Sequence, residues 1–433
     1  MRMTLSSNLT KFVALALEAA AFLALAIWVG KTYAADLVAH RLTVPELRLA
    51  TRLDPSDSDY HLKLGRSLQY EPENIDPEGA LAELRRAVAL NPDDAEAWVS
   101  LAGALQLQGE SDQAAAALSR TDFLAPSQPG FQWAVGNFLL LHGQTEDSFR
   151  HFKAVLAGTR DYDGPIFNIA WKASGDASTI LAQLIPAEFA AENSYLSYLV
   201  GNKKYPEAEK VWDRIAAERQ TFDPRSVSGY LDALVGIKQP AEAYSVWSYC
   251  VKRGLLSPTE SETPQNLVIN GDFEDGLLNM GFDWRIYAAA GVDVSLDRTT
   301  FHSGAHSLLL RFPGNQNPYY GSTFQMVRVE PDHLYHLRAF MKTEGITTDS
   351  GPRIEVRDYY DPRALDLFSA SLLGTTPGWS QIDMDVKTGP KTELVGISVS
   401  RLPSEKIDSL IAGKVWVDDV KLTPASEPAI QGR

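Results

Sequence analysis

The sequence predicts a multidomain α plus β protein: a transmembrane helix at the N-terminus, an all-α repeat region in the middle and an all-β sandwich at the C-terminal end. A long apolar run comes first, alanine-rich segments with helical spacing follow, and short alternating runs begin after residue 266. The chain has 433 residues, too many for one ordinary core. We expect an anchor at 1–33, helical repeats at 40–256, a linker at 257–265, a sandwich at 266–424 and a tail at 425–433.

Charge and cysteine content exclude two classes of protein. The net charge is −15, and no stripe of lysine, arginine and aromatic residues stands out. Binding to phosphates needs a concentrated basic face, so nucleic acid is not an expected partner. The chain has one cysteine, Cys250, and therefore no intrachain disulfide framework. We interpret Cys250 as a small buried apolar residue on a helix rather than as a reactive thiol.

The apolar run at 12–30 contains one charge, Glu18. As a helix it would span roughly 28 Å, about the thickness of the hydrocarbon layer. The alternative is a cleavable signal peptide, whose apolar region would be shorter and would end at a clean small-residue site. We therefore predict an uncleaved signal anchor with a short cytoplasmic tip. Positive residues lie on both sides, so charge leaves the orientation open. We place the protein in the inner membrane of a bacterium, with most of the chain in the periplasm.

Three short motifs that end in proline recur through the middle region. They are "LDP", "LNP" and "LAP", which begin at residues 53, 90 and 124, at intervals of 37 and 34 residues. This period and punctuation resemble the tetratricopeptide repeat, in which each unit is a pair of helices. In this match, Gly65, Ala102 and Gly136 are the small residues that let the second helix of a pair approach the first closely. We expect five to six pairs, with 158–190 helical but irregular.

The resemblance implies protein–protein recognition along a concave surface and does not imply catalysis. A helical pair cannot bury its apolar face alone, so neighbouring pairs stack into a solenoid. We interpret Tyr195, Tyr198 and Tyr205 as core residues, and we find no basic clamp of the kind that binds a terminal carboxylate. The alternative is a purely structural role, in which the solenoid holds the C-terminal domain away from the membrane.

The C-terminal region begins with the polar linker "SPTESETPQ" and then changes to a period of two. About eight to ten short strands favour a sandwich or jelly roll. The chain contains, in this order, "NLVINGDFEDG", "HSGAHSLLLRF", "FQMVRVEPDHLYHLRAFMKT" and "VWVDDVKL". Together these motifs resemble the jelly-roll carbohydrate-binding modules attached to many bacterial glycan-degrading enzymes. The resemblance implies the fold more strongly than sugar binding, because the same fold also occurs in non-binding and protein-binding domains.

Within this resemblance, residues 266–273 are expected to form the first strand and its turn. Leu267, Ile269 and Phe273 would anchor the strand to the core, and Gly271 would allow the turn. Glu274 would then project at the edge of the sheet, while Asp275 would be a turn residue only.

The same resemblance implies a structural calcium ion. In these modules it lies between the glutamate of the first motif, the loop before "SG" and an aspartate of the last strand. Calcium binds about six to eight oxygen ligands. Strand alternation places Asp418 on the face of Trp416 and Val420, where a carboxylate needs compensation, so we prefer Asp418 to Asp419. The implied ligands are Glu274, Asp418 or Asp419, and backbone carbonyls near His302 and Ser303. The alternative is that these carboxylates cap turns or lie in solvent.

Carbohydrate binding needs flat aromatic rings that stack on sugar faces and polar groups that fix hydroxyls. Trp284 and Trp379 belong to the framework of the resembled fold, so we expect both in the core. Adjacent residues of a strand point to opposite faces, so at most one tyrosine of a neighbouring pair would face a ligand. The alternative is that these tyrosines lie in exposed loops without a ligand. The candidates are Tyr319, Tyr320, Tyr359, Tyr360, Arg357, Gln316 and Arg401.

No catalytic constellation is recognisable in the sequence. Glu355 and Asp358 suggest paired glycosidase carboxylates, but their odd spacing puts them on opposite faces of a strand. We find no nucleophile elbow, phosphate loop or zinc-protease helix. We therefore expect a membrane-anchored, non-catalytic binding and scaffold protein of bacterial polysaccharide synthesis or export. Its repeats would recruit a protein partner and its sandwich would bind glycan. The alternatives are an envelope assembly factor that binds only proteins and, more remotely, a glycan-processing enzyme.

Overall fold

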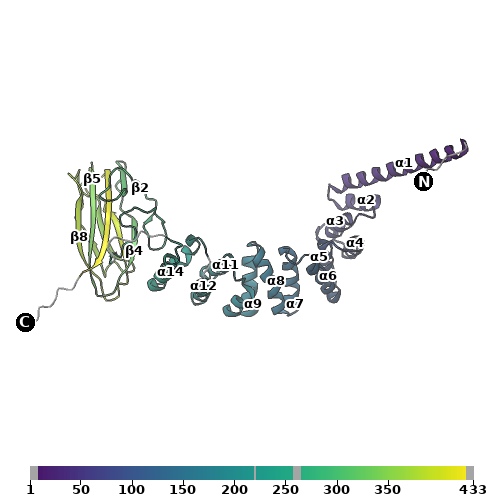
Figure 1. Cartoon of the computed structure of the whole chain (residues 1–433), viewed down its shortest axis with the longest axis horizontal. Coiled ribbons are helices and arrows are strands. Elements are labelled where there is room, and N and C mark those ends of the chain that lie inside the picture. Colours follow the sequence, from purple (N-terminus) through teal and green to yellow (C-terminus); the bar gives the residue numbers. More distant parts are fainter. Residues whose placement is uncertain (1–7, 219–220, 257–264, 426–433) are drawn as a thin grey trace, which may run out of the picture. The chain divides into compact units, whose positions relative to one another are not determined.

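The structure is a computed structural model that describes residues 8–218, 221–256 and 265–425 (Figure 1). The chain divides into two compact units, Met1–Tyr195 and Leu196–Arg433. The predicted fold class is confirmed, because helices in pairs come first and two antiparallel sheets follow. Three predicted segments lie mostly or partly outside the described residues: the linker at 257–265, the tail at 425–433 and the first part of the anchor.

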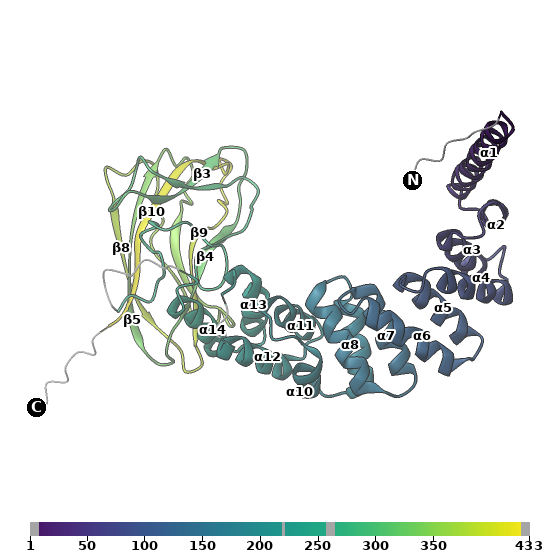
Figure 2. The same ribbon diagram turned by 45° about the vertical axis from the view of Figure 1, so that its right-hand side comes forward.

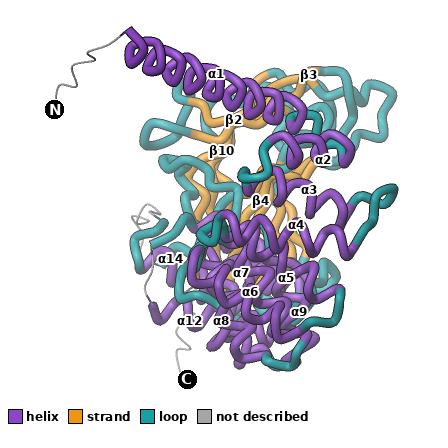
Figure 3. Tube along the Cα trace, turned by 90° about the vertical axis from the view of Figure 1, so that its right-hand side faces the viewer, coloured by secondary structure: helices purple, strands orange, loops and turns teal. Residues whose placement is uncertain are grey.

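The first unit begins with a long apolar helix, α1 (Asn8–Ala39), which leads into α2 (Val44–Leu53) (Figure 3). Its segment Lys11–Ala39 is long and apolar enough to cross a membrane, a test that a signal sequence also passes. The last turn differs from the rest of the helix, because Ala35 and Ala39 are buried in one cluster with Leu47 of α2. The helix therefore continues beyond the predicted end of the anchor at residue 33 and packs on the first helix of the repeat region.

The next helices of the first unit follow one another as packed pairs (Figure 1). The contacts join α3 to α4, α5 to α6 and α7 to α8. Beyond α8 the chain is helical but irregular, as predicted, and includes a π-helical segment at Ile180–Leu184. The bounds are α3 Ser58–Tyr70, α4 Pro77–Leu90, α5 Ala95–Leu107, α6 Ser111–Leu124, α7 Pro129–Leu141, α8 Thr145–Gly158, α9 Asp163–Ser174 and α10 Ala177–Thr179.

Small residues allow the helices of a pair to pack closely, as predicted. A Cβ atom added to Gly65 of α3 would lie 2.6 Å from Cγ of Leu84 in α4. At the same place in a later pair, a Cβ atom on Gly136 of α7 would lie 2.6 Å from Cε1 of Phe152 in α8. Such distances are far inside van der Waals contact, so a larger side chain at either glycine would push the two helices apart.

The segments that follow the proline motifs also start the next helix. Asp57 and Asp94 are N-caps, and their side chains accept hydrogen bonds from the backbone N–H groups of Asp59 (2.8 Å) and Glu96 (2.9 Å). The first N–H groups of a helix have no partner within the helix, so these carboxylates stabilise its beginning. Each of the first two motifs therefore marks the end of one helix and the start of the next.

Within its described residues, the second unit contains three further α-helices, a short 3₁₀ helix and the sandwich. Helix α11 (Phe189–Gly201) crosses the division between the units. It is followed by α12 (Tyr205–Glu218), a short 3₁₀ helix at Pro224–Val227, α13 (Ser228–Gly236) and α14 (Pro240–Lys252). Cys250 of α14 is buried, as expected, and burial raises the pKa of its thiol to about 11.

The sandwich consists of two antiparallel five-stranded sheets (Figure 2). We call them the β4 sheet, with strand order β1-β4-β9-β6-β7, and the β10 sheet, with strand order β2-β3-β10-β5-β8. Apolar side chains of both sheets and the fully buried Trp284 form one core between them. The strands are β1 Arg285–Ile286, β2 Asp293–Asp297, β3 Ser307–Pro313, β4 Tyr320–Arg328, β5 Leu334–Glu344, β6 Arg353–Asp358, β7 Asp366–Phe368, β8 Ser380–Lys387, β9 Leu394–Arg401 and β10 Ala412–Pro424.

The predicted first strand at 266–273 is wrong in detail. The segment runs beside the end of β10, where the N–H of Leu267 donates to the carbonyl of Leu422 (2.9 Å), but it is not a regular strand. Asn270 and Phe273 have left-handed φ angles of 49° and 56°, which interrupt an extended backbone. Phe273 is fully buried as predicted, whereas Ile269 is only partly buried. The neighbouring Val268, which is 2% exposed, fills the core in its place.

A β-bulge in β10 overturns the predicted alternation of that strand. The register with β5 shifts between Asp418 and Lys421, and Asp419 has a left-handed φ of 49°. Because a bulge inserts an extra residue, the side chains after it change face. Val417 and Val420 therefore both lie in the core, and Trp416 does not share a face with Val420 as predicted.

The last helical pair packs directly on the sandwich (Figure 2). Nη2 of Arg285 in β1 lies 2.6 Å from Oδ1 of Asp232 in α13, and the Arg285 side chain is only 8% exposed. Phe282 makes edge-on ring contacts with Tyr244 (5.2 Å) and Trp247 (6.2 Å) of α14. Repeat region and sandwich are therefore joined by a packed interface within the second unit.

Candidate functional site

The predicted ligand Glu274 is bound by nitrogen donors of one tight turn. Its Oε1 atom accepts hydrogen bonds from the backbone N–H groups of Ala305 (2.7 Å) and His306 (2.8 Å). The turn depends on Gly304, whose φ is +66° and against which the Glu274 carboxylate packs. Burial opposes ionisation of Glu274, but these donors and the His306 side chain outweigh it and lower the pKa of the carboxyl group.

The second predicted ligand, Asp418, is completely buried beneath the neighbouring turn. Its Oδ2 atom accepts hydrogen bonds from the N–H groups of His302 (2.7 Å) and Ser303 (3.3 Å), and its Oδ1 atom accepts one from Asp419 (2.8 Å). Burial raises the pKa of Asp418 to about 6, although the three N–H donors act in the opposite direction. His302 and Ser303 of this turn thus donate their backbone N–H groups to the Asp418 carboxylate. Asp419 is turned toward the His302 ring, with 2.6 Å between Oδ2 and Nδ1.

A cavity of about 190 Å³ lies beside this turn, and three of its lining residues are Asp272, Glu274 and Asp419. Asp272 was not selected from the sequence, although its position two residues before Glu274 was a usable signal. Burial, and then the charges of Glu274 and Asp419, raise the pKa of Asp272. Carboxylate oxygens are the donors that calcium prefers. Among the described residues, however, no group of three or more His, Cys, Asp or Glu side chains is close enough to hold a metal ion. The calcium ion therefore stays a prediction.

Two of the predicted carbohydrate-binding residues are buried, which excludes them from direct contact with a glycan in this conformation. Tyr320 is 1% exposed, and its hydroxyl group is hydrogen-bonded to Thr323 (2.6 Å). The Arg401 side chain is fully buried and donates to the backbone carbonyls of Ser350 (3.0 Å) and Pro318 (2.6 Å). Arg401 thus ties loops together, because β9 is a central strand and its ends lie under those loops.

The other members of the predicted set separate into two places. Tyr319, which is 58% exposed, and Gln316 lie in the loop before β4. Tyr360 faces the last helical pair instead: its hydroxyl group donates to the carbonyl of Val235 (3.0 Å), and Lys238 lies over its ring. Burial raises the pKa of Tyr360 to about 12. Tyr360 therefore belongs to the interface between helices and sandwich.

Tyr359 and Arg357 remain on the outer face of the β4 sheet. The ring of Tyr359 lies 6.5 Å from that of Phe324, which in turn lies 5.9 Å from Tyr287. Tyr287 is 53% exposed. We call these three residues the aromatic strip. Phe324 and Tyr287 were not predicted, because the pairing of β1 with β4 and of β9 with β4 and β6 brings them beside the segment that follows β6.

Polar groups accompany the aromatic strip on the same face. The register pairs Phe324 with Ser398 and Ser398 with Glu355, so these three form one row across the sheet. Glu355 accepts a hydrogen bond from Ser398 (3.2 Å) and lies 3.8 Å from Arg357. The structure thus provides flat rings beside hydrogen-bonding groups, which is the combination that sugar recognition uses.

Trp379 is a further correction. It is only half-buried and lies edge-on to His302, 5.7 Å between ring centres, rather than in the core. His302 itself stacks on Phe340 of β5, with ring centres 3.6 Å apart. Trp284, in contrast, is fully buried as predicted, and its indole N–H donates to the carbonyl of Asn270 (3.0 Å).

Residues 73–132 match the family model of the tetratricopeptide repeat. This segment runs from the turn between α3 and α4 into α7 and includes the pair α5 and α6. The repeat character predicted from the proline motifs is therefore confirmed for the middle region. Comparison with curated proteins gave no match.

Solved structures similar to this chain fall into helical and β-sandwich proteins. PilF of Pseudomonas aeruginosa is 17% identical, with 52% of this chain and 93% of that chain covered and a TM-score of 0.27. TmCBM61, solved with β-1,4-galactotriose, is 17% identical over 37% of this chain and 99% of that chain, with a TM-score of 0.26. The CBM22-1–GH10 modules of Clostridium thermocellum xylanase 10B are 16% identical, with 35% of this chain and 27% of that chain covered and a TM-score of 0.24. These scores are too low to support an argument about function.

Proposed function

We propose that this chain is a membrane-anchored, non-catalytic binding and scaffold protein, whose repeats bind a protein partner and whose sandwich binds a glycan. The observation that carries the proposal is the tetratricopeptide match at 73–132 within a series of packed helical pairs. Stacked pairs of this kind bury one face against their neighbours and leave a continuous surface for a partner.

The partner-binding role is tested by selection from a peptide library with the full chain in detergent micelles. We expect enrichment of peptides that bind to the chain and are displaced by the same peptide in free form. A library screen that yields no such peptide, with a known peptide-binding protein as positive control, contradicts the partner-binding role.

For the glycan we propose the aromatic strip of Tyr287, Phe324 and Tyr359. Its rings are connected across the β4 sheet, and Arg357 and Glu355 lie beside them. The Arg357 side chain is 43% exposed, so its guanidinium group can donate hydrogen bonds to sugar hydroxyls beside the stacking surface.

A glycan array tests this assignment with the full chain rather than an isolated sandwich, because removal of α13 and α14 would expose Phe282 and Tyr360. We expect binding to at least one glycan and a loss of about tenfold or more when Tyr287 and Tyr359 are both changed to alanine. Tyr319→Ala is the control, since Tyr319 (58% exposed) is about as exposed as Tyr287 (53%) but lies outside the aromatic strip. Equal losses for both variants would transfer the site to the loop before β4. No binding to any glycan would contradict the sugar-binding role.

We further propose that α1 anchors the protein in the inner membrane of a bacterium and that the rest of the chain lies in the periplasm. The length and apolar composition of Lys11–Ala39 support this placement. Polysaccharide synthesis or export is the context that combines a membrane anchor, a protein-binding solenoid and a sugar-binding module. A reporter that is active only in the periplasm, fused after residue 433, is expected to be active. An inactive reporter with intact fusion protein would refute this orientation.

One observation favours a second candidate function, an envelope assembly factor that binds only proteins. Part of the outer surface of the sandwich packs on helices of the same chain, because Arg285 and Tyr360 contact Asp232 and Val235 of α13. In this case the sandwich would extend the protein-binding surface of the repeats. The glycan array separates the two candidates, since only the first predicts binding that depends on the aromatic strip.

A further inference from the structure

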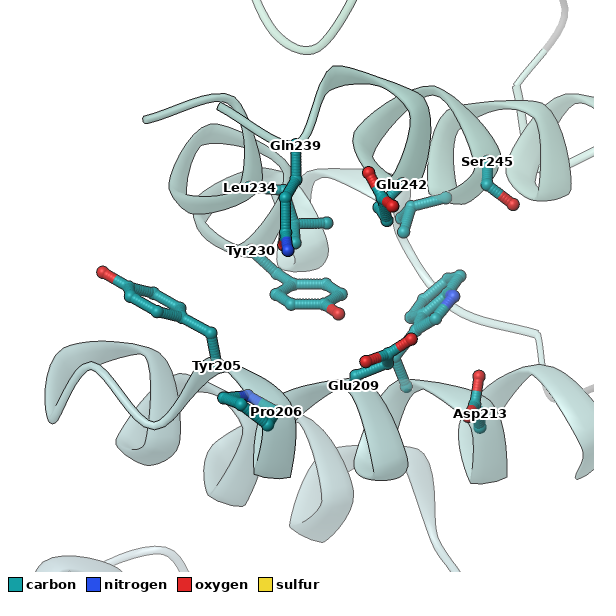
Figure 4. A pocket seen from close by; sticks show the side chains of 11 residues that line it. Tyr205, Pro206, Glu209, Asp213, Tyr230, Leu234, Gln239, Glu242 and Ser245 are labelled. Atoms are coloured by element: carbon teal, nitrogen blue, oxygen red, sulfur yellow. The ribbon is translucent and has the colours of Figure 1, made fainter. Parts of the chain in front are cut away.

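A cavity of about 230 Å³ lies among the last three helices of the repeat region (Figure 4). Helix α12 contributes Tyr205 and Trp212 to its wall, and α13 contributes Tyr230. The ring of Trp212 lies 6.2 Å from that of Tyr230, and both side chains are less than a tenth exposed. The wall of the cavity is therefore largely aromatic and fixed by packing.

Three carboxylates surround these rings. Glu209 and Asp213 are one helical turn apart on α12, and Glu242 comes from α14 on the other side. In Figure 4 the side chains of Glu209 and Glu242 extend toward the space between the helices, from opposite walls. None of the three forms an ion pair or hydrogen bond with any residue in the described part of the chain. Three negative charges thus border one small aromatic cavity, and none of them is paired with a cation in the part of the chain that the structure describes.

The polar end of a mostly buried side chain also faces the cavity. Tyr230 is only 5% exposed, yet within the described ranges its hydroxyl group has no hydrogen-bond partner. Figure 4 shows this hydroxyl group on the side of the cavity where the Glu209 carboxylate lies. Burial, and then the charges of Glu209, Asp213 and Glu242, raise the pKa of Tyr230, so the phenol stays protonated.

We propose that this cavity binds the lysine or arginine side chain of a partner polypeptide. The inference rests on the proposed partner-binding role of the repeats and specifies the chemistry of the partner. Aromatic faces attract cations, and carboxylates at the rim supply charge-assisted hydrogen bonds to them. The cavity is smaller than the roughly 300–1,000 Å³ of sites for whole small molecules, so its size suits a single side chain.

The hydroxyl group of Tyr230 completes the site. A guanidinium or ammonium group has several N–H donors and no acceptor, so it can donate to Glu209, Glu242 and the phenol oxygen together. The floor supplied by Trp212 and Tyr230 would cover the apolar stem of the side chain. A neutral residue of similar shape gains only the contact with the rings, and an acidic residue is repelled by all three carboxylates.

The test uses the full chain in detergent micelles, labelled with 5-fluorotryptophan, and the probe N-acetyl-arginine methylamide. The fluorine signal of Trp212 is assigned from the variant Trp212→Phe. We expect a saturable shift of this signal with the arginine probe and its lysine analogue. The uncharged citrulline analogue, which has nearly the same shape, is expected to leave the signal unchanged.

Charge variants locate the site. The double variant Glu209→Gln with Glu242→Gln is expected to weaken probe binding about tenfold, and Tyr230→Phe about threefold. Glu207→Gln is the matched control, because Glu207 lies on the same helix but does not line the cavity. Binding of the citrulline analogue with equal affinity, or an equal loss in the control, would overturn the proposal, as would an unshifted Trp212 signal with the arginine probe.

Failure of this inference is distinguishable from failure of the proposed partner-binding role. If the library selection yields binding peptides but their affinity is unchanged by replacement of lysine and arginine, this site is wrong and the partner-binding role stands. If the arginine probe binds as described but no peptide is selected, the cavity is a cation site and the partner-binding role fails. Both the cavity site and the partner-binding role are supported if peptides bind less tightly when their basic residues are replaced and also bind less tightly to the Glu209→Gln, Glu242→Gln protein.

Discussion

Gly136→Ala is the sharpest test of how the helical pairs are held together. The new Cβ atom would lie 2.6 Å from Cε1 and 2.7 Å from Cδ1 of Phe152. Phe152 is fully buried and its ring packs 5.4 Å from that of Trp133, so the ring has no free space into which it can turn. The substitution therefore forces α7 and α8 apart or strains the Phe152 side chain.

The magnitude follows from two opposing effects. Alanine is more favourable than glycine within a helix by about 0.5–1 kcal/mol, whereas overpacking of a core costs about 1–3 kcal/mol. Gly103→Ala in α5 separates the two effects, because its Cβ atom would meet Gln69 at 3.4 Å and Tyr70 at 3.5 Å, near ordinary contact. We expect Gly103→Ala to stabilise its helix, and the two variants to differ by about 1–3 kcal/mol.

The assay is native-state hydrogen exchange of the full chain, followed in α7 and α8 for one variant and in α5 and α6 for the other. Repeat arrays open locally, so local opening free energies report the change better than one melting temperature. In a Phe152→Leu background, Gly136→Ala is expected to cost less, because the smaller side chain relieves the overlap. A difference between the glycine variants below about 0.5 kcal/mol, the usual error of additivity, would refute the steric explanation.

Three further predictions concern the second unit. Burial raises the pKa of Asp283 from 3.8 to about 6, so the folded state keeps a proton that the unfolded chain loses, and stability falls as pH rises through this window. The free energy of unfolding, measured with urea, therefore depends on pH, and Asp283→Asn is expected to remove up to roughly 3 kcal/mol of that dependence. Identical pH profiles for variant and wild type would contradict this prediction. Arg285→Ala leaves the carbonyl of Gly281 and the carboxylate of Asp232 without their donor. It should reduce the hydrogen-exchange protection of α13 and α14 by about 1–3 kcal/mol. Unchanged protection would rule out the packed interface between the last helical pair and the sandwich. If calcium binds near Glu274, a free concentration about 100-fold above Kd adds about 2.7 kcal/mol of stability, and the melting temperature rises unless a chelator is present. The calcium prediction is wrong if wild type shows no shift or if Glu274→Ala keeps the whole shift.

The positions of the small residues in the repeats could be predicted because they follow from local rules. Gly65 and Gly136 recur at one place in each helical pair, and the helical period fixes which side chains face each other. Their observed contacts with Leu84 and Phe152 agree with that expectation. The sandwich core could be predicted for a similar reason, since alternation identifies the buried face of each regular strand.

The candidate glycan site could be predicted only in part. Strand alternation was not a sufficient guide, because Tyr319 lies in the loop before β4 and Tyr359 and Tyr360 follow the end of β6. Tyr320 is buried with its hydroxyl group bonded to Thr323, and Tyr360 meets Val235 of α13, more than a hundred residues earlier. No periodicity within a strand reports contacts of that kind.

The sequence by itself determined the succession of apolar helix, helical pairs and antiparallel strands, because apolar periodicity and proline punctuation are local properties of the chain. Tertiary structure alone decided which side chains are available to a ligand. The bulge at Asp419 changed the faces of β10, and the pairing of β1 with β4 brought Tyr287 and Phe324 beside Tyr359. The packing of α12, α13 and α14 likewise gathered Glu209, Tyr230 and Glu242 around one cavity. Burial and neighbourhood depend on all elements that meet at a point, and a single segment of sequence contains only one of them.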